Sequence, residues 1–173
     1  IDGLMELLVA SIHGELPVLN ENGVKLTTIG DVSKLPAACI DSLSDAVNAT
    51  LKNDKINLIL ALNYSSREEI VSATKKIVQR VLDGSLALDE INIQEFQQAL
   101  YTANIPDPEL VIRTSGEHRV SNFLLWQLAY AELHFTPVFW PEFRRAHLME
   151  AIYDYQRREL RFGKTSEQVI LEK

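Results

Sequence analysis

The chain has 173 residues, 46% of them hydrophobic and 24% charged, which is the composition of a globular domain with a sizeable core and excludes a disordered chain. No apolar run approaches the roughly 20 residues of a transmembrane helix, and the first residues lack the basic region of a signal peptide. A single cysteine, Cys39, excludes an internal disulfide framework, and the net charge of -7 argues against nucleic acid, so we expect a cytoplasmic protein without nucleic-acid partners.

Hydrophobic periodicity in the first part of the chain switches between helical and strand spacing. In chain order it predicts a helix over 1–19, a strand over 24–29, a helix over 35–51, a buried strand over 56–64, a helix over 66–82 and a short helix over 93–101. Ser66 and Glu69 have the spacing of a capping box at the start of the helix over 66–82, and Asp83 with Gly84 ends it.

The second part of the chain continues the alternation. The pattern predicts a buried strand over 110–114, a loop over 115–120, a buried helix over 121–133, a short strand over 138–140 and a last helix from 142 to about 161. Alternating strands and helices indicate a single α/β domain over 1–173, with a parallel sheet covered by helices on both faces. Ligands of such sheets bind beyond the carboxyl ends of strands, which directs attention to the loops after Tyr64 and Thr114.

Charge is distributed unevenly along these elements. Residues 1–112 hold 8 basic against 16 acidic residues, whereas residues 113–163 hold seven arginines, no lysine and six acidic residues. Arginine without lysine favours bidentate recognition of phosphate or carboxylate. Most of the five arginines after residue 140 are expected to be solvated helix residues, so Arg113 and Arg119 are the stronger candidates for a site.

The loop sequence RTSGEHRVSN, over 113–122, concentrates polar chemistry. Arg113 follows an apolar strand, where a guanidinium is costly unless it faces an anion or a carboxylate. Gly116 permits a sharp turn, Arg119 adds a second fork, and Ser121 precedes the free amides of the predicted helix. These groups predict a phosphate or diphosphate pocket; the alternative is a structural loop in which Arg113 pairs with Glu117.

Two further side chains are candidates for metal or phosphate chemistry. Glu132 is the one charged residue of the predicted buried helix, so its carboxylate must be paired, protonated or bound to a metal, unless it reaches solvent from the helix end. His118 has the chemistry to hydrogen-bond a phosphate or a metal-bound water, although a lone loop histidine more often does neither.

These same residues carry a family resemblance. The stretch DPELVIRTSGEHRVSNFLLWQLAYAELHFTPVFWPEF, over 107–143, resembles the C-terminal signature of the cis-prenyltransferases, and most of all that of the bacterial undecaprenyl diphosphate synthases. LMELLVASIHGEL, ALNYSSREEI and RRELRFG are supporting matches, so the resemblance covers nearly the whole chain. It implies the cis-prenyltransferase fold.

The resemblance also implies a reaction and a first substrate site. The family lengthens an allylic diphosphate, usually farnesyl diphosphate, by condensing it repeatedly with isopentenyl diphosphate, and the bacterial product is undecaprenyl diphosphate, a precursor of the cell-wall lipid carrier used for peptidoglycan. Arg113, Arg119 and Ser121, together with Val120 between the last two, would bind the diphosphate of isopentenyl diphosphate, and His118 and Glu117 are the other two expected substrate-binding residues.

A magnesium ion is implied beside this site. Glu132 resembles the glutamate associated with the family's Mg²⁺, and Glu117 with His118 would lie next to it. Arg113, Arg119 and Glu132 are therefore the expected catalytic residues. Magnesium and arginine would together stabilise the departing diphosphate.

The resemblance further implies a homodimer that touches the membrane transiently through its lipid product. Arg161 and Gly163 resemble a C-terminal element that in some members completes the partner subunit's site. The family's N-terminal DGNGRWA motif, which carries a metal-binding aspartate, has no counterpart in these 173 residues. We therefore expect the C-terminal portion of such an enzyme, inactive by itself.

Two alternatives remain open. A non-catalytic partner subunit of a heteromeric cis-prenyltransferase would also lack the aspartate motif, but such partners usually lose the diphosphate-binding arginines, which this chain retains. An unrelated α/β phosphate-binding domain is the generic alternative, and the length of the match argues against it.

Overall fold

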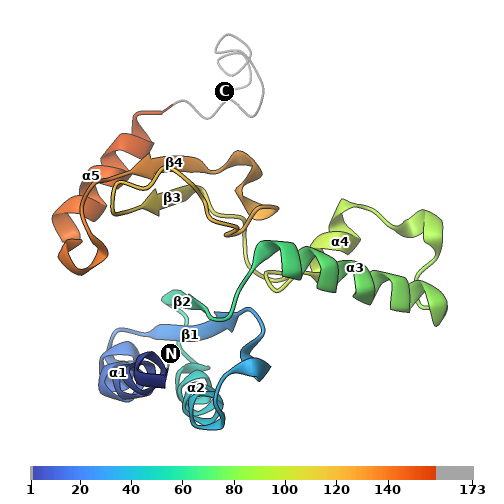
Figure 1. Cartoon of the computed structure of the whole chain (residues 1–173), viewed down its shortest axis with the longest axis horizontal. Coiled ribbons are helices and arrows are strands. Elements are labelled where there is room, and N and C mark those ends of the chain that lie inside the picture. The colour runs from blue at the N-terminus through green and yellow to red at the C-terminus, as the bar shows by residue number, and fades with distance from the viewer. Residues whose placement is uncertain (1, 159–173) are drawn as a thin grey trace. The chain divides into compact units, whose positions relative to one another are not determined.

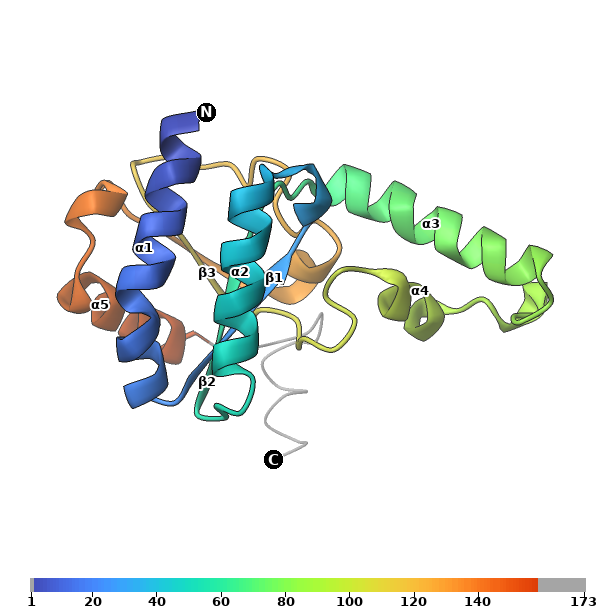
Figure 2. The same ribbon diagram turned by 90° about the horizontal axis from the view of Figure 1, so that it is seen from below.

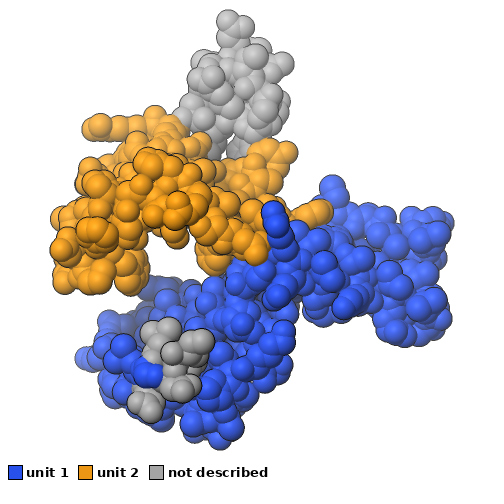
Figure 3. Space-filling model, viewed as in Figure 1, with its two compact units in different colours: residues 1–104 blue, residues 105–173 orange. Residues whose placement is uncertain are grey.

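The computed structural model describes residues 2–158. The chain divides into two compact units, residues 1–104 (unit 1) and residues 105–173 (unit 2), which are coloured separately in Figure 3. Both units combine parallel strands with helices, so the predicted α/β class is confirmed. The expectation of one domain over 1–173 stays a prediction.

Unit 1 is built on two parallel strands, β1 (Val24–Ile29) and β2 (Ile56–Ala61), paired from Val24 opposite Ile56 to Ile29 opposite Ala61. The helices α1 (Asp2–Glu21) and α2 (Ala37–Thr50) lie side by side on one face of these strands (Figures 1 and 2). Helices α1 and α2 and strand β1 lie close to where the sequence pattern predicts them, because each has a clear apolar period of its own, and β2 begins at the predicted residue.

The core of unit 1 lies between these helices and β1. Ile12 of α1, Leu26 of β1 and Leu43 of α2 are buried against one another. The Thr50 hydroxyl accepts a hydrogen bond from the Leu26 amide at 3.0 Å and donates one to the Ala46 carbonyl at 2.9 Å, which ties the end of α2 to the strand.

The buried strand predicted over 56–64 is wrong in two respects. Strand β2 ends at Ala61, and its side chains are largely exposed, with Ile56 at 60% and Leu58 at 41%. The helices of unit 1 pack mainly over β1, which leaves the side chains of β2 largely uncovered within this unit. The apolar run therefore predicts that a strand is present here, but it does not predict whether the side chains of the strand are buried.

The remaining helices of unit 1 are α3 (Ser66–Leu82) and α4 (Ile93–Ala99), which pack against each other (Figure 2). The capping box predicted at Ser66 is wrong, because Ser65 is the N-cap residue and makes no side-chain cap bond. Glu69 is instead buried at 1% exposure, where its carboxylate accepts hydrogen bonds from the Tyr64 hydroxyl at 2.5 Å and the Tyr101 amide at 2.8 Å.

Unit 2 contains a second pair of parallel strands, β3 (Leu110–Arg113) and β4 (Glu132–Phe135), with α5 (Arg145–Gln156) packed against β4 (Figure 1). Leu110 lies opposite Glu132 and Arg113 opposite Phe135. The two strands therefore place Arg113 at the carboxyl edge and Glu132 at the amino edge of the same small sheet.

The buried helix predicted over 121–133 is wrong. Ser121, Asn122 and Leu124 have positive φ angles of 48°, 62° and 48°, which a right-handed helix does not allow. The segment forms turns and a short 3-10 helix over Gln127–Tyr130, and its last residues enter β4. An apolar run without a clear period does not distinguish these structures.

Two smaller expectations also change. The strand predicted over 138–140 is wrong, because Trp140–Glu142 forms a 3-10 turn in which the Trp140 ring stacks on Phe143 at 5.7 Å between centroids. The last helix begins at Arg145 and ends at Gln156, so the predicted start at residue 142 is three residues early and the predicted end near residue 161 is about five residues late. Arg161 and Gly163 lie outside the described residues. No helix within 2–158 is long and apolar enough to cross a membrane.

Candidate functional site

A pocket of about 340 Å³ lies in unit 2 at the carboxyl end of β3, where the sequence pattern directs attention. Three polar residues of the RTSGEHRVSN loop, Arg113, Arg119 and Ser121, share it with apolar side chains. The other lining residues are Val111, Ile112, Val120, Phe123, Leu128, Leu133 and Phe135. The structure therefore brings together four of the residues predicted to bind substrate, since Val120 is among the lining residues.

Arg113 is the last residue of β3 and is half-buried. Its Nε is buried and has no hydrogen-bond partner among the described residues. A buried donor without an acceptor costs about 1–3 kcal/mol. The alternative in which Arg113 pairs with Glu117 is wrong, because the Glu117 carboxylate contacts Arg119 instead, and the Arg113 Nε is left able to donate to a ligand.

Glu117 forms its ion pair with Arg119 and not with Arg113. Its Nη1 lies 2.5 Å from Glu117 Oε2, and its side chain is 68% exposed. Exposed ion pairs of this kind contribute only about 0–1 kcal/mol. The free energy of the Arg119–Glu117 ion pair is therefore small, and a diphosphate can displace Glu117 from the Arg119 guanidinium at little cost.

The loop backbone is held in an unusual conformation. Ser115 and Gly116 both have positive φ, at 66° and 67°, a region where glycine is at ease and serine is strained. Their amides donate to the Val138 carbonyl at 2.9 Å and the Thr136 carbonyl at 3.0 Å, which fixes the loop to the chain after β4. Strain that is held in place by such bonds is typical of ligand sites.

One predicted component of the pocket is absent. Because no α-helix begins at Ser121, the expected helix N-terminus with its free amides does not contribute; Phe123 instead donates its amide to the Val120 carbonyl at 3.0 Å in a turn. His118 packs its ring against Phe135 at 4.9 Å between centroids, which places it beside the pocket wall.

Glu132 does not join this pocket. It is the first residue of β4, at the amino end of the strand, and lies three residue steps, or about 10 Å, before Phe135. Its Oε2 accepts a hydrogen bond from Arg158 Nη1 at 2.7 Å. The sequence allows the Glu132 carboxylate to be paired, protonated, bound to a metal or exposed to solvent. Among the described residues it is paired with Arg158.

Arg158 is a partner that the sequence pattern does not reveal. Its Nη2 lies 2.5 Å from Asp154 Oδ2, which His134 Nδ1 also approaches at 2.9 Å. These two contacts hold the pKa of Asp154 below its ordinary value, His134 having the larger effect, and Glu132 together with Asp154 raises the pKa of Arg158. The i,i+4 spacing of Asp154 and Arg158 is a visible signal of one of these contacts.

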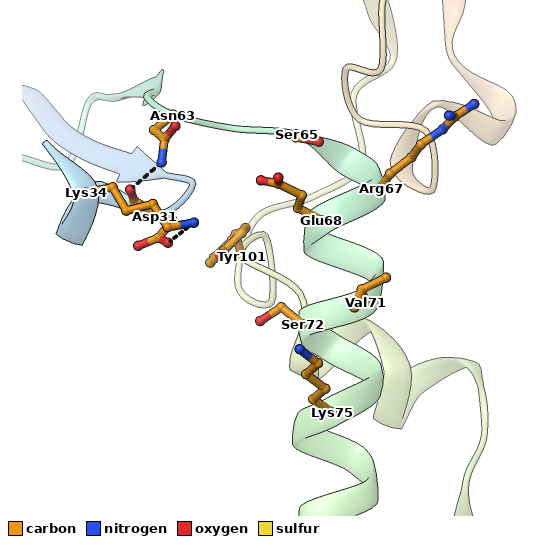
Figure 4. A pocket seen from close by; sticks show the side chains of 10 residues that line it. All are labelled: Asp31, Lys34, Asn63, Ser65, Arg67, Glu68, Val71, Ser72, Lys75 and Tyr101. Atoms are coloured by element: carbon orange, nitrogen blue, oxygen red, sulfur yellow. Dashed lines mark hydrogen bonds and ion pairs between the residues drawn. The ribbon is translucent and has the colours of Figure 1, made fainter.

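Unit 1 has a cavity of its own, of about 450 Å³, at the carboxyl ends of β1 and β2 (Figure 4). Asp31 is held there by Lys34 Nζ at 3.1 Å, and Asn63 donates to the Asp31 carbonyl at 2.9 Å. Glu68, Ser72 and Lys75 extend from α3 toward Tyr101, whereas Arg67 points away from them. Two acidic and three basic side chains line this cavity, so it lacks the one-sided charge of the unit 2 pocket.

The unit 2 pocket combines two kinds of surface. Two guanidinium groups and a hydroxyl suit a phosphate or diphosphate, and the apolar wall suits a short hydrocarbon attached to it. The geometry therefore fits a small amphipathic diphosphate better than a fully polar sugar phosphate or nucleotide.

Comparisons with known proteins point the same way. The family described as undecaprenyl diphosphate synthase matches residues 1–163. An isoprenyl transferase of Clostridium tetani is 48% identical over 94% of this chain and 64% of the relative. A Pseudomonas aeruginosa protein named ditrans,polycis-undecaprenyl-diphosphate synthase ((2E,6E)-farnesyl-diphosphate specific) is 44% identical over 99% of the chain and 68% of the relative. The chain thus spans about two thirds of the length of these curated relatives.

Solved structures, among them the following two, also resemble the chain. Lavandulyl diphosphate synthase from Lavandula x intermedia, in complex with dimethylallyl diphosphate, superposes with a TM-score of 0.91 at 37% identity, over 94% of this chain and 71% of the other. A probable undecaprenyl diphosphate synthase from Campylobacter jejuni gives 0.81 at 32% identity, over 95% and 74% of the two chains. Both carry the predicted fold.

Proposed function

The chain belongs to the undecaprenyl diphosphate synthase family of prenyltransferases, and from that premise we propose that it serves cis-prenyl chain elongation by binding isopentenyl diphosphate in the unit 2 pocket. The observation that carries this proposal is the buried Nε of Arg113, a donor without an acceptor among the described residues, in a pocket where Arg119 and Ser121 adjoin an apolar wall. A diphosphate oxygen supplies that acceptor, and the five-carbon chain lies against the apolar wall.

The residues of the pocket then act by position and charge. In the condensation the bond between the allylic carbon and its diphosphate oxygen breaks, a carbon–carbon bond forms to the isopentenyl unit, and a proton leaves that unit. Arg113 and Arg119 hold the isopentenyl diphosphate and orient its carbon chain, and Ser121 adds a hydroxyl donor. Orientation of two reactants accounts for several kcal/mol of a barrier, on the order of 7–11 at best.

The further substrate and product are proposed from the relatives. Farnesyl diphosphate is the proposed allylic substrate, supported by the name of the Pseudomonas aeruginosa relative, and undecaprenyl diphosphate is the proposed product. A homodimer in the cytoplasm, in transient contact with the membrane through its lipid product, completes the proposal on the strength of the family alone.

The family resemblance implies a magnesium ion near Glu132, but the described residues do not provide a full set of ligands for it. Glu132 has one carboxylate oxygen engaged with Arg158, and the described residues contain no group of three histidine, cysteine or acidic side chains placed to hold a metal ion. Mg²⁺ usually takes one or two carboxylates together with substrate phosphates. Residues 2–158 therefore do not fit a complete magnesium site, and we assign no step of the reaction to a metal ion on them.

The test is a calorimetric titration of the 173-residue chain with isopentenyl diphosphate and, separately, with farnesyl diphosphate. Arg119→Ala should weaken the affinity for isopentenyl diphosphate by about 10- to 100-fold, because one charge-assisted hydrogen bond contributes on the order of 1.5–3 kcal/mol. The affinity for farnesyl diphosphate should change less. Arg144→Ala, in the same unit but outside the pocket, is the matched control.

Absence of binding by the wild-type chain, or equal losses for both diphosphates in Arg119→Ala, would overturn the assignment of the pocket. Incorporation of labelled isopentenyl diphosphate into lipid is measured on the same samples. It tests the expectation that these 173 residues alone do not turn over.

A further inference from the structure

Strand β4 has two faces with different roles. Leu133 and Phe135 line the unit 2 pocket, whereas Glu132 and His134, which alternate with them, face the α5 side. This alternation follows from the two-residue period of a strand. Any group that fixes Glu132 and His134 therefore also fixes the wall of the pocket.

Arg158 grips this strand at two points. Nη1 donates to Glu132 Oε2 at 2.7 Å and to the Leu133 carbonyl at 2.9 Å, so one nitrogen holds both the side chain and the backbone of the strand. Nη2 donates to Asp154 Oδ2 at 2.5 Å, and Asp154 in turn contacts His134 Nδ1 at 2.9 Å. The planar guanidinium fork is suited to such a double contact, and a lysine ammonium is not.

We infer that Arg158 is a positioning residue for the anion pocket: it fixes β4 from the α5 side, so that Leu133 and Phe135 keep the shape of the wall beside Arg113 and Arg119. The inference rests on the proposed function for its ligand, isopentenyl diphosphate, but the positioning itself is independent of that function. Arg158 does not line the pocket and acts only through the strand.

The chain offers a matched control beside it. Arg157 carries the same charge and is exposed, and its side chain makes no hydrogen bond or ion pair with the described residues. Arg157→Gln and Arg158→Gln therefore change the net charge equally, but only Arg158→Gln removes the hydrogen bonds to Glu132 and Leu133 of β4. Arg158→Lys keeps the charge but loses the fork.

The first measurement needs no ligand. The His118 ring packs against Phe135, so its proton resonances report the position of the pocket wall. We expect Arg158→Gln to shift the His118 ring signals in the NMR spectrum and Arg157→Gln to leave them in place. His118→Gln assigns the signals.

The second measurement is the affinity for isopentenyl diphosphate by calorimetry, at a temperature where circular dichroism shows every variant folded. Arg158→Gln should weaken binding by about 2- to 30-fold, Arg158→Lys should restore it only in part, and Arg157→Gln should bind like the wild type. The double variant Arg158→Gln/Glu132→Gln should lose little more affinity for isopentenyl diphosphate than Arg158→Gln alone, because both substitutions remove the contact between these two residues. Combining Arg158→Gln with Arg119→Ala should give additive losses.

The outcomes separate the two proposals. If the wild-type chain does not bind isopentenyl diphosphate but Arg158→Gln still shifts the His118 signals, the proposed function fails and the positioning role stands. If Arg158→Gln matches Arg157→Gln in both the His118 signals and the affinity, the positioning role is overturned. It is likewise overturned if Arg158→Gln lowers only the unfolding midpoint.

Discussion

At the scale of single residues, the buried Nε of Arg113, which has no acceptor among the described residues, lowers the free energy of unfolding of the chain without its ligand. We expect Arg113→Met, which keeps the length of the side chain and removes the donor, to leave the free energy of unfolding unchanged or to raise it by about 1 kcal/mol. Binding of isopentenyl diphosphate should be lost in the same variant. Urea unfolding and calorimetry measure the two effects.

The contrary result for Arg113 is equally clear. A variant that unfolds more easily but binds the diphosphate normally would mean that the guanidinium stabilises the fold and does not serve a ligand. Arg145→Met, an arginine on an exposed stretch of α5, controls for the general effect of removing a charge from unit 2.

Gly30 shows backbone constraint at the end of β1. Its φ is 106°, and a Cβ built there would lie 2.1 Å from the Leu62 carbonyl oxygen. Gly30→Ala should therefore lower the free energy of unfolding by about 2 kcal/mol or more. Gly84→Ala is the matched control, since its φ is 76° but nothing lies within 4 Å, so only the conformational cost of about 1 kcal/mol applies. Equal losses in urea unfolding would contradict the close approach of Gly30 to Leu62.

At the scale of elements, the contact between β4 and α5 should depend on pH through Asp154. Its folded-state pKa lies below the ordinary value of 3.8, because His134 and Arg158 favour the carboxylate. The stabilisation is therefore present above that ordinary value and is lost as the pH falls through the lowered pKa. Wild type should be more stable than Asp154→Asn at about pH 6, and this advantage should be smaller at about pH 3, since it is lost only as the pH falls through the lowered pKa.

Urea unfolding at the two pH values measures the effect. Asp83→Asn serves as a control, because the pKa of Asp83 is also lowered but by Ser85 within a helix-end turn, away from β4. A difference between wild type and Asp154→Asn that is the same at both pH values would show that the carboxylate charge is not what holds α5 to the strand.

Elements with a clear apolar period could be predicted from the sequence, and those without one could not. Helices α1, α2 and α3 and strand β1 repeat their apolar residues at a single spacing, so their type and bounds follow closely. The run over 121–133 is apolar at nearly every position, and its course is set by left-handed residues and by pairing of its end with β3. These are tertiary effects that no local spacing contains.

The same division holds in the candidate site. Arg113, Arg119 and Ser121 could be predicted to converge because they follow one strand end within a short loop. Glu132 could not be placed, since its distance from that loop depends on whether the intervening residues form a helix or turns. The contacts of Arg158 with Glu132 and Leu133 could not be predicted, because these partners lie 26 and 25 residues away in sequence; only its contact with Asp154 has a recognisable i,i+4 spacing.

At the scale of the whole molecule, the net charge of -7 should keep the chain off nucleic acid despite the arginines of unit 2. We expect no change in the fluorescence anisotropy of a labelled DNA duplex on addition of the chain at about 0.15 M salt. Titration with inorganic diphosphate in the same buffer is the control for an active pocket. Binding of the duplex that weakens steeply with salt would contradict the expectation.

The distribution of two rare residue types has a practical consequence. The two tryptophans, Trp126 and Trp140, both belong to unit 2, and Trp140 on its 3-10 turn is 70% exposed. The one thiol, Cys39, is buried in unit 1. Tryptophan emission is thus an optical reporter for unit 2 and thiol labelling a chemical reporter for unit 1, so the opening of each unit can be timed separately in the unmodified chain.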